Sequence, residues 1–329
     1  MNMLVDFKQD PIQIEVEARR YLGLETPPAR IDALLRIAVT SRSCFPEIEE
    51  LTKDWVASVA VPAFNLIRQR QGVQNAFCAL GTGVGLDALA AIEILGVLRL
   101  GITDVHDDVV TTAVRNILSN LPTGHGVRLE SGFGDLLEPL AGFLTRYDLI
   151  YENLPNVPIA DAERIAEGRT SAAHLPPRSE TVPAFVQAQL LSLHYLALQQ
   201  AHDFLRPGGA VLSMLGSRIP LAVYRDMAAQ AGHRAEIYTF GWKAQAEPEN
   251  VIRGHAEQQR AGYGPFHFYR VDDLIDAFQG VELAASGTAA FDIEERLAAK
   301  RLDPFQAWEA FLRGDQVGHT YVALRSQPA

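Results

Sequence analysis

From residue 76 onward, the apolar positions of the chain gather in short runs that alternate with longer amphipathic stretches. Short apolar runs bounded by glycine, proline or acidic residues are typical of strands buried on both faces of a sheet. The longer stretches have the length and periodicity of helices. Strands that alternate with helices predict an α/β fold with a doubly wound, mostly parallel Rossmann-like sheet, covered by helices on both faces. The strands are expected at 76–80, 100–103, 127–130, 148–151 and 210–215, with further strands at 235–240 and 319–325.

The residues before this core show a different pattern, in which apolar positions mix with charges and prolines. The apolar positions of residues 12–70 fall near helical spacing, so we expect an N-terminal helical cap over residues 1–74. The stretch between the last two expected strands is too long for a loop, which predicts a C-terminal helical insertion. The expected divisions are a core over 75–242, an inserted helical segment over 243–318 and a final core strand over 319–329.

Composition and charge argue against several classes of function. The chain has 329 residues and a net charge of −11, because 29 lysines and arginines face 40 acidic side chains. An excess of acid argues against a protein that binds the phosphate backbone, so no nucleic-acid partner is expected. Cys44 and Cys78 are too few for a disulfide framework or a cysteine zinc site, and no metal is expected. No signal peptide or membrane-spanning run is visible, which predicts a cytoplasmic protein without a membrane partner.

A glycine-rich turn, Gly81–Gly85, joins the first expected core strand to the helix after it and reads Gly-Thr-Gly-Val-Gly. Glycines are needed where the backbone approaches a ligand closely, and the helix N-terminus beyond offers free N–H groups and a positive dipole end. Asp104 closes the next strand, where a carboxylate can accept both ribose hydroxyls of an adenosine-type cofactor. The dinucleotide fingerprint needs a small residue where Leu86 stands, which disfavours a nicotinamide dehydrogenase.

The third glycine of the turn gives a G-x-G-x-G spacing, which resembles that of class I S-adenosylmethionine-dependent methyltransferases. Further segments between about residues 75 and 240 are similar to this family's motifs and stand in the same order. They are Asp104–Asp108 before a helix, Gly134-Asp135-Leu136, the strand and loop Asp148–Asn156, and Leu205-Arg206-Pro207-Gly208-Gly209. The resemblance implies S-adenosylmethionine as the cofactor, bound by residues of these motifs. They are Gly81, Thr82, Gly83, Gly85, Asp104, Val105, Gly134, Asp135 and Asn153.

The chain departs from the family pattern at two places. The acid that usually stands two residues before the first glycine is replaced by Ala79. The loop after the fourth core strand reads Asn153-Leu154-Pro155-Asn156, whereas enzymes that methylate glutamine or adenine nitrogens carry Asn-Pro-Pro and an aromatic residue. Asn153 can still accept a hydrogen bond from an attacking nitrogen through its side-chain carbonyl. The aromatic that stacks on a planar substrate is missing, which disfavours glutamine and base methylation.

The candidate catalytic residues lie at the carboxyl ends of two expected strands, where sheets of this kind bind ligands. Tyr151, Glu152 and Asn153 end one strand, and Ser217 follows another. Side chains alternate along a strand, so Tyr151 and Asn153 are expected on one side and Glu152 on the other. Glu152 also has a structural interpretation as a salt-bridge partner, and Ser217 has one as a loop cap.

Three functions remain open. The first is N- or O-methyl transfer to a small molecule, with Asn153 orienting the attacking nitrogen. The second is cyclisation of S-adenosylmethionine by its own α-amine, giving azetidine-2-carboxylate and methylthioadenosine, because the chain looks similar to bacterial azetidine-2-carboxylate synthases. The third is binding of the cofactor without catalysis. An inserted helical layer often packs against a second copy, so a homodimer is compatible with each function.

Overall fold

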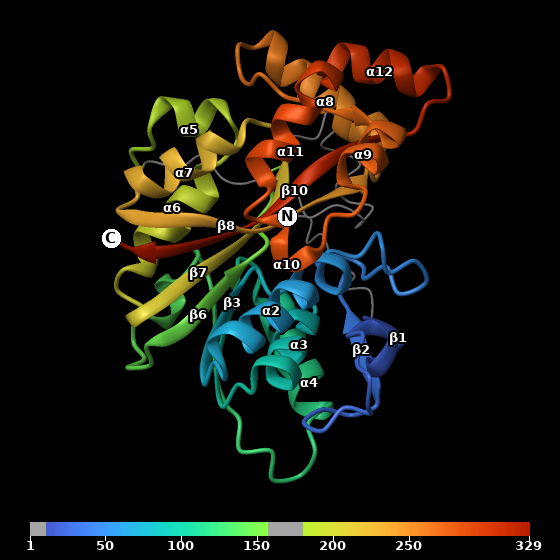
Figure 1. Ribbon diagram of the computed structural model, residues 1–329. Helices are drawn as coiled ribbons and strands as arrows, with labels where there is room; N and C mark the ends of the chain where they lie inside the picture. The colour runs from blue at the N-terminus through green and yellow to red at the C-terminus, as the bar shows by residue number, and fades with distance from the viewer. Residues whose placement is uncertain (1–10, 157–179) are drawn as a thin grey trace, which may run out of the picture.

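One large sheet forms the centre of the computed structural model, which describes residues 11–156 and 180–329 (Figure 1). Its strands are β3 (Ala76–Leu80), β4 (Arg99–Asp104), β5 (Arg128–Phe133), β6 (Tyr147–Glu152), β7 (Leu205–Ser217), β8 (His233–Ala244), β9 (Tyr269–Arg270) and β10 (Val317–Pro328). They lie in the order β5-β4-β3-β6-β7-β10-β8, and β9 pairs with β10. Neighbours from β5 to β7 are parallel, whereas β10 is antiparallel to both β7 and β8. The predicted mostly parallel α/β sheet is therefore confirmed.

Helices cover both faces of this sheet, because successive residues of its buried strands point to opposite sides. In β3, Phe77 and Ala79 belong to the apolar core on one face, and Cys78 and Leu80 belong to the core on the other. The first face carries α2 (Val61–Gln71), α3 (Leu86–Leu95) and α4 (Asp107–Ser119), and the second carries α5 (Ala184–Ala188), α6 (Ser192–Ala201) and α7 (Leu221–Gln230) (Figure 1). A 3-10 turn, η2 (Glu138–Leu140), lies between β5 and β6.

The N-terminal part is not the helical cap that its pattern predicts. It forms a two-stranded antiparallel sheet of β1 (Ile12–Glu17) and β2 (Leu34–Val39), with a short helix, α1 (Ala18–Tyr21), between the strands. β1 reads Ile-Gln-Ile-Glu-Val-Glu, and this strict alternation has the period of a strand and not of a helix. Beyond α1, helix is confined to a π-helix, η1 (Val56–Ala60), and to α2, which continues it.

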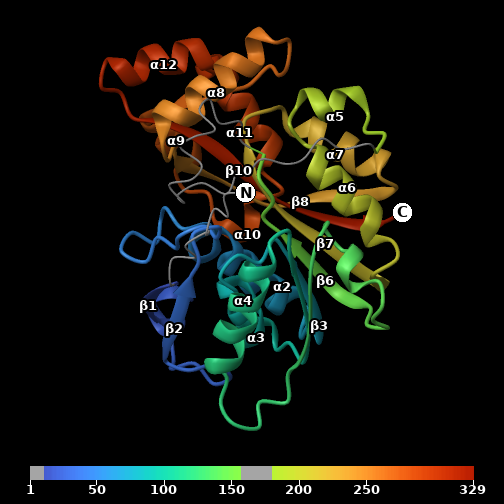
Figure 2. The same cartoon turned by 180° about the vertical axis from the view of Figure 1, so that it is seen from behind.

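Two asparagines, Asn116 of α4 and Asn120 directly after it, bind the edge of this hairpin as another strand would. Asn116 accepts a hydrogen bond from Ala38 N and donates one to Ala38 O, each at 2.9 Å. Asn120 makes the same pair of bonds with Arg36, at 2.8 Å and 3.0 Å. Residues four apart share one face of a helix, and residues two apart share one edge of a strand, so the two spacings match. The hairpin is thereby fixed beside α4 (Figure 2).

The segment between β8 and β10 is helical, as its length predicts. Its elements are α8 (Pro248–Arg260), α9 (Val271–Phe278), α10 (Leu283–Ser286), α11 (Ala290–Leu297), the 3-10 turn η4 (Ala298–Lys300) and α12 (Pro304–Leu312). Helices α8 and α12 pack together through a small apolar core that includes Ile252, Phe268 and Ala307. They lie at the end of the sheet where β8 finishes and β10 begins (Figure 1). None of the described helices is long and apolar enough to cross a membrane.

Candidate functional site

The glycine-rich turn follows β3 and opens α3, as predicted. Gly81, Gly83 and Gly85 have positive φ angles of 64°, 54° and 86°, a conformation that residues with a Cβ rarely adopt. A Cβ on Gly85 would lie 3.1 Å from Ile117 of α4, so this glycine lets α3 and α4 pack closely. A Cβ on Gly83 would meet no atom of the described chain within 4 Å. The backbone at Gly83 therefore leaves room for a ligand against the turn.

Asp104 ends β4 and lies directly against the glycine turn. Its Oδ2 accepts a hydrogen bond from Gly83 N, and its Oδ1 accepts one from His106 N, both at 3.2 Å. Burial raises the pKa of the Asp104 carboxyl, and the donors at His106 and Gly83 oppose that rise. Each carboxylate oxygen can accept a further hydrogen bond, so the hydroxyl groups of a ligand can still bind here. The structure thus brings together two residues that the sequence predicts as cofactor contacts.

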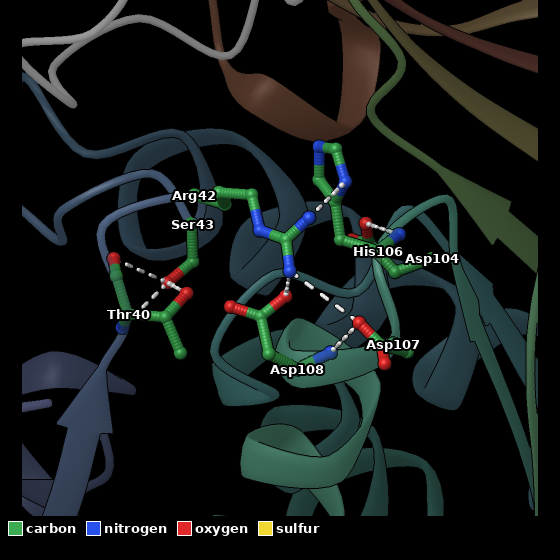
Figure 3. Close-up of polar contacts among 7 residues, drawn as sticks. All are labelled: Thr40, Arg42, Ser43, Asp104, His106, Asp107 and Asp108. Atoms are coloured by element: carbon green, nitrogen blue, oxygen red, sulfur yellow. Dashed lines mark hydrogen bonds and ion pairs between the residues drawn. The ribbon is translucent and has the colours of Figure 1, made fainter. Parts of the chain in front are cut away.

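An arginine from the N-terminal segment holds the loop that follows Asp104 (Figure 3). Arg42 Nη1 donates to His106 Nδ1 at 3.3 Å. Arg42 Nη2 lies 3.4 Å from Asp107 Oδ1 and forms a second ion pair with Asp108. Arg42 is not predicted from the sequence, because its loop is far from Asp104 along the chain and no local pattern marks it. The N-terminal segment is therefore tied to the candidate cofactor site.

Two exposed apolar side chains stand next to Asp104. Val105 is 51% exposed, and Phe133, at the end of β5, is 65% exposed. Asp104 and Phe133 are partners in the pairing of β4 with β5, and Gly134 N donates to Asp104 O at 2.9 Å. Asp135 follows on the same loop and is partly buried. Apolar surface beside a few polar groups is typical of sites that bind an aromatic ligand group.

A buried carboxyl that sequence analysis misses lies beside this turn. Asp87, in the first turn of α3, is 4% exposed, and its Oδ1 accepts a hydrogen bond from Thr82 Oγ1 at 3.0 Å. Desolvation raises the pKa of Asp87 from 3.8 to about 7, although the donors at Ala88 N and Thr82 Oγ1 lower it. An acid within an apolar first helical turn is the sequence signal for such a group. The titratable carboxyl of Asp87 therefore contacts the glycine turn through Thr82.

The loop after β6 touches the glycine turn as well. The position of a Cβ on Gly81 lies 3.3 Å from Leu154 Cδ2, so the loop and the turn are in contact. Asn153, which is partly buried, begins this loop. Asn153 precedes Leu154 and therefore belongs to the loop that contacts the turn, and its predicted role in orienting an amine stays a prediction.

Glu152 is a fully buried partner of His194. The two Glu152 carboxylate oxygens lie 2.8 Å and 2.9 Å from His194 Nδ1, and neither side chain is exposed. Glu152 Oε2 also accepts a hydrogen bond from Leu154 N at 3.1 Å. This arrangement matches the structural interpretation of Glu152, which here fixes the start of the loop.

Tyr151 and Ser217 are also buried. The Tyr151 ring packs on the opposite face of the sheet from Glu152, with its centroid 5.3 Å from that of Phe64. Ser217 is 2% exposed, and its backbone oxygen accepts a hydrogen bond from Thr320 Oγ1 at 2.8 Å. Both side chains are therefore enclosed by other residues of the protein.

No protein-family model matches the sequence, and no curated protein matches it either. Among solved structures, the ribosomal protein L11 methylase of Lactobacillus delbrueckii subsp. bulgaricus is 18% identical over 54% of this chain and 70% of its own, with a TM-score of 0.35. The precorrin-6y C5,15-methyltransferase of Geobacter metallireducens is 10% identical over 60% and 84%, with a TM-score of 0.36. A Bacillus halodurans protein provisionally described as a methyltransferase is 13% identical over 81% and 99%, with a TM-score of 0.40. These likenesses are remote, so the fold assignment rests on the sheet itself.

Proposed function

We propose that this protein is an enzyme that uses S-adenosylmethionine, and that its reaction is N- or O-methyl transfer to a small molecule. The observation that carries the proposal is the hydrogen bond between Gly83 N and Asp104 Oδ2, which joins the glycine turn and the β4 carboxylate in one site. The site lies at the carboxyl ends of parallel strands, where α/β sheets bind ligands.

The residues of this site fit the parts of the cofactor. Asp104 offers carboxylate oxygens for the two ribose hydroxyls. Val105 and Phe133 offer apolar surface for the adenine ring. The open backbone at Gly83 supports close approach of the methionine part. Asp87 supplies, next to the turn, an acid in place of the one missing before the first glycine, and its ionised form would attract the positive charges of the methionine part.

Bound S-adenosylmethionine supplies a sulfonium centre whose attached carbons are open to displacement by a nucleophile. The task of the chain is then to hold that nucleophile in line and to keep water out. The Asn153 side-chain carbonyl can accept a hydrogen bond from an attacking amine and so orient its lone pair without adding charge. Glu152 is committed to His194 and Leu154 N, so we assign it to positioning the loop and not to proton removal.

A second candidate function is favoured by Asn156. This residue stands where enzymes that methylate amides and bases carry an aromatic ring, and its Nδ2 donates to Gly216 O of β7 at 3.1 Å. A site without a stacking ring supports cyclisation of S-adenosylmethionine by its own α-amine. In that reaction the amine nitrogen bonds to the γ-carbon, the bond from that carbon to sulfur breaks with its electron pair, and the nitrogen releases a proton. The sulfur leaves as methylthioadenosine.

Incubation of the purified protein with S-adenosylmethionine alone, read by mass spectrometry, separates these functions. Methylthioadenosine together with a product of azetidine-2-carboxylate mass would support cyclisation and refute methyl transfer. Cofactor that binds unchanged, and becomes S-adenosylhomocysteine when a pool of small acceptors is added, would support methyl transfer. Binding without turnover in that pool would indicate a cofactor-binding protein without catalysis, and no binding would refute all three functions.

A further inference from the structure

Arg218 is a buried guanidinium without an acidic partner in the described part of the chain. It directly follows β7 and is 4% exposed. Its Nη2 donates to Gln245 Oε1 at 2.7 Å, and its guanidinium carbon lies 5.6 Å from the centre of the Phe268 ring. Its Nε is buried and has no hydrogen-bond partner among the described residues. The groups that Arg218 contacts here are neutral, so they leave its positive charge uncompensated.

The titratable groups around Arg218 do not offset its charge: burial lowers the pKa of Arg218 to about 10, and Tyr224 opposes this lowering only in part. His255 of α8 and His319 of β10 are buried, and desolvation lowers the pKa of both, with Arg218 as the next cause. Lys243, at the end of β8, also lowers the pKa of His319. Asp54 acts on Lys243 by raising its pKa, but burial outweighs this and lowers the pKa of Lys243 to about 8. An arginine removed from water needs an anion to offset its lost hydration.

This cluster lies beside the loop that begins at the candidate catalytic asparagine. The position of a Cβ on Gly216 is 2.6 Å from Arg218 Nη1 and 3.7 Å from Asn156 Oδ1, so both side chains lie against the same point of β7. Lys243 and His319 face each other in the pairing of β8 with β10. The carboxyl ends of β7 and β8 and the start of β10 thus bring together cationic and imidazole groups that are far apart along the chain.

We propose that Arg218 binds a carboxylate of the small molecule on which this site acts. The inference rests on the proposed function, because it names the class of ligand for the same site. A carboxylate matches the planar guanidinium, can take two parallel hydrogen bonds from it, and supplies the missing negative charge. The carboxylate belongs to a separate acceptor, such as an amino or hydroxy acid, or to the amino-acid end of S-adenosylmethionine. Its chemistry at Arg218 is the same in both cases.

Three variants test the proposal. Arg218→Gln and Arg218→Met remove the charge, and Arg301→Gln is the matched control. Arg301 is a partly buried arginine of the C-terminal helical region whose Nη2 lies 3.8 Å from Glu294 Oε1, so it has the acidic partner that Arg218 lacks. Without ligand, Arg218→Met should unfold at or above the wild-type temperature, because an uncompensated buried charge has been removed. A large fall in that temperature would show a structural role and overturn the proposal.

Calorimetric titrations with S-adenosylmethionine and with methylthioadenosine, which has no carboxylate, identify the source of the anion. If the carboxylate is the cofactor's own, Arg218→Gln should lower the affinity for S-adenosylmethionine by about 10- to 100-fold and leave the affinity for methylthioadenosine unchanged. If it belongs to a separate acceptor, the variant should bind both as the wild type does. Acetate should then raise the unfolding temperature of the wild type and of Arg301→Gln but not that of Arg218→Gln. Acetamide, which carries no charge, should raise none of the three.

Unchanged affinity for S-adenosylmethionine, together with an acetate effect that is equal in the wild type and Arg218→Gln, would overturn the proposal. A protein that binds neither adenosyl ligand would instead refute the proposed function. The comparison of acetate with acetamide would still test Arg218 in that case, so the two failures are distinguishable.

Discussion

Replacing Asp87 with asparagine should stabilise the protein at neutral and higher pH. Asp87 is 4% exposed, and desolvation raises the pKa of its carboxyl from 3.8 to about 7. Between these two values the folded protein keeps the Asp87 proton, whereas the unfolded chain has already lost it. Stability therefore falls as the pH rises through this window, because the folded state binds more protons than the unfolded state. Asparagine has no proton to lose and keeps an acceptor for Thr82 Oγ1.

The magnitude follows from the size of the pKa change. One pKa unit corresponds to about 1.4 kcal/mol, so a rise from 3.8 to about 7 makes ionised Asp87 about 4 kcal/mol less favourable in the folded protein. The wild type and Asp87→Asn should have similar free energies of unfolding near about pH 4. The advantage of the variant should grow by about 1.4 kcal/mol per pH unit until about pH 7 and stay constant above it.

Urea unfolding of both proteins between about pH 5 and pH 8 measures this difference. Asp276→Asn is the matched control, because Asp276 lies exposed on α9, and its free energy of unfolding should stay close to that of the wild type throughout. A difference between Asp87→Asn and the wild type that does not change over this range would refute the reasoning. So would a variant that is less stable than the wild type at the upper end.

Asp104→Asn should lower the binding affinity for S-adenosylmethionine and for methylthioadenosine by the same factor, about 10 to 100, because the ribose hydroxyls of both ligands lose a carboxylate oxygen. Calorimetric titrations measure both affinities, and unequal losses would contradict this prediction. Asn116→Ala should lower the free energy of unfolding, measured in urea, by about 3 kcal/mol, because Ala38 N, Ala38 O and Val84 O each lose a hydrogen bond. Unchanged stability would contradict this prediction. Tyr151→Phe should keep the stability and turnover of the wild type, because the buried Tyr151 hydroxyl has no hydrogen-bond partner among the described residues. A turnover rate at least about tenfold below that of the wild type would contradict this prediction and indicate a catalytic role for Tyr151.

The core sheet and the candidate cofactor site are predictable because their signals are local. β3 reads Ala-Phe-Cys-Ala-Leu, and each of its residues is buried, which is what a strand covered on both faces requires. Gly83 and Asp104 follow neighbouring parallel strands, and the carboxyl ends of such strands meet at one edge of the sheet. Their meeting in space therefore follows once the strands are recognised and placed side by side.

The N-terminal hairpin is harder to predict, because the strand period is clear only in β1 and the residues that support β2 are distant along the chain. Ile12 and Leu34 are apolar but 60% and 45% exposed, so the apolar positions do not mark one buried face. The edge of β2 that does not pair with β1 binds two side chains far along the chain, Asn116 of α4 and Asn120 directly after it. No local periodicity carries that information. The cluster at Arg218 is unpredicted for a similar reason, since it depends on β10 entering the sheet between β7 and β8.

Asp87 and Arg218 are ionisable groups that folding stability alone does not explain. Each is buried, each has its pKa shifted by desolvation against the charged form, and each lies beside a loop of the candidate site. Groups that lower the stability of the ligand-free protein are expected where a ligand later compensates them. A positive ligand group near Asp87 and a carboxylate near Arg218 would do so, and S-adenosylmethionine itself carries both kinds of charge. A loss of S-adenosylmethionine affinity alone in Arg218→Gln would therefore favour a site built around one ligand, as cyclisation requires. Retained affinity, together with an effect of acetate that Arg218→Gln loses, would favour a separate carboxylate acceptor and methyl transfer.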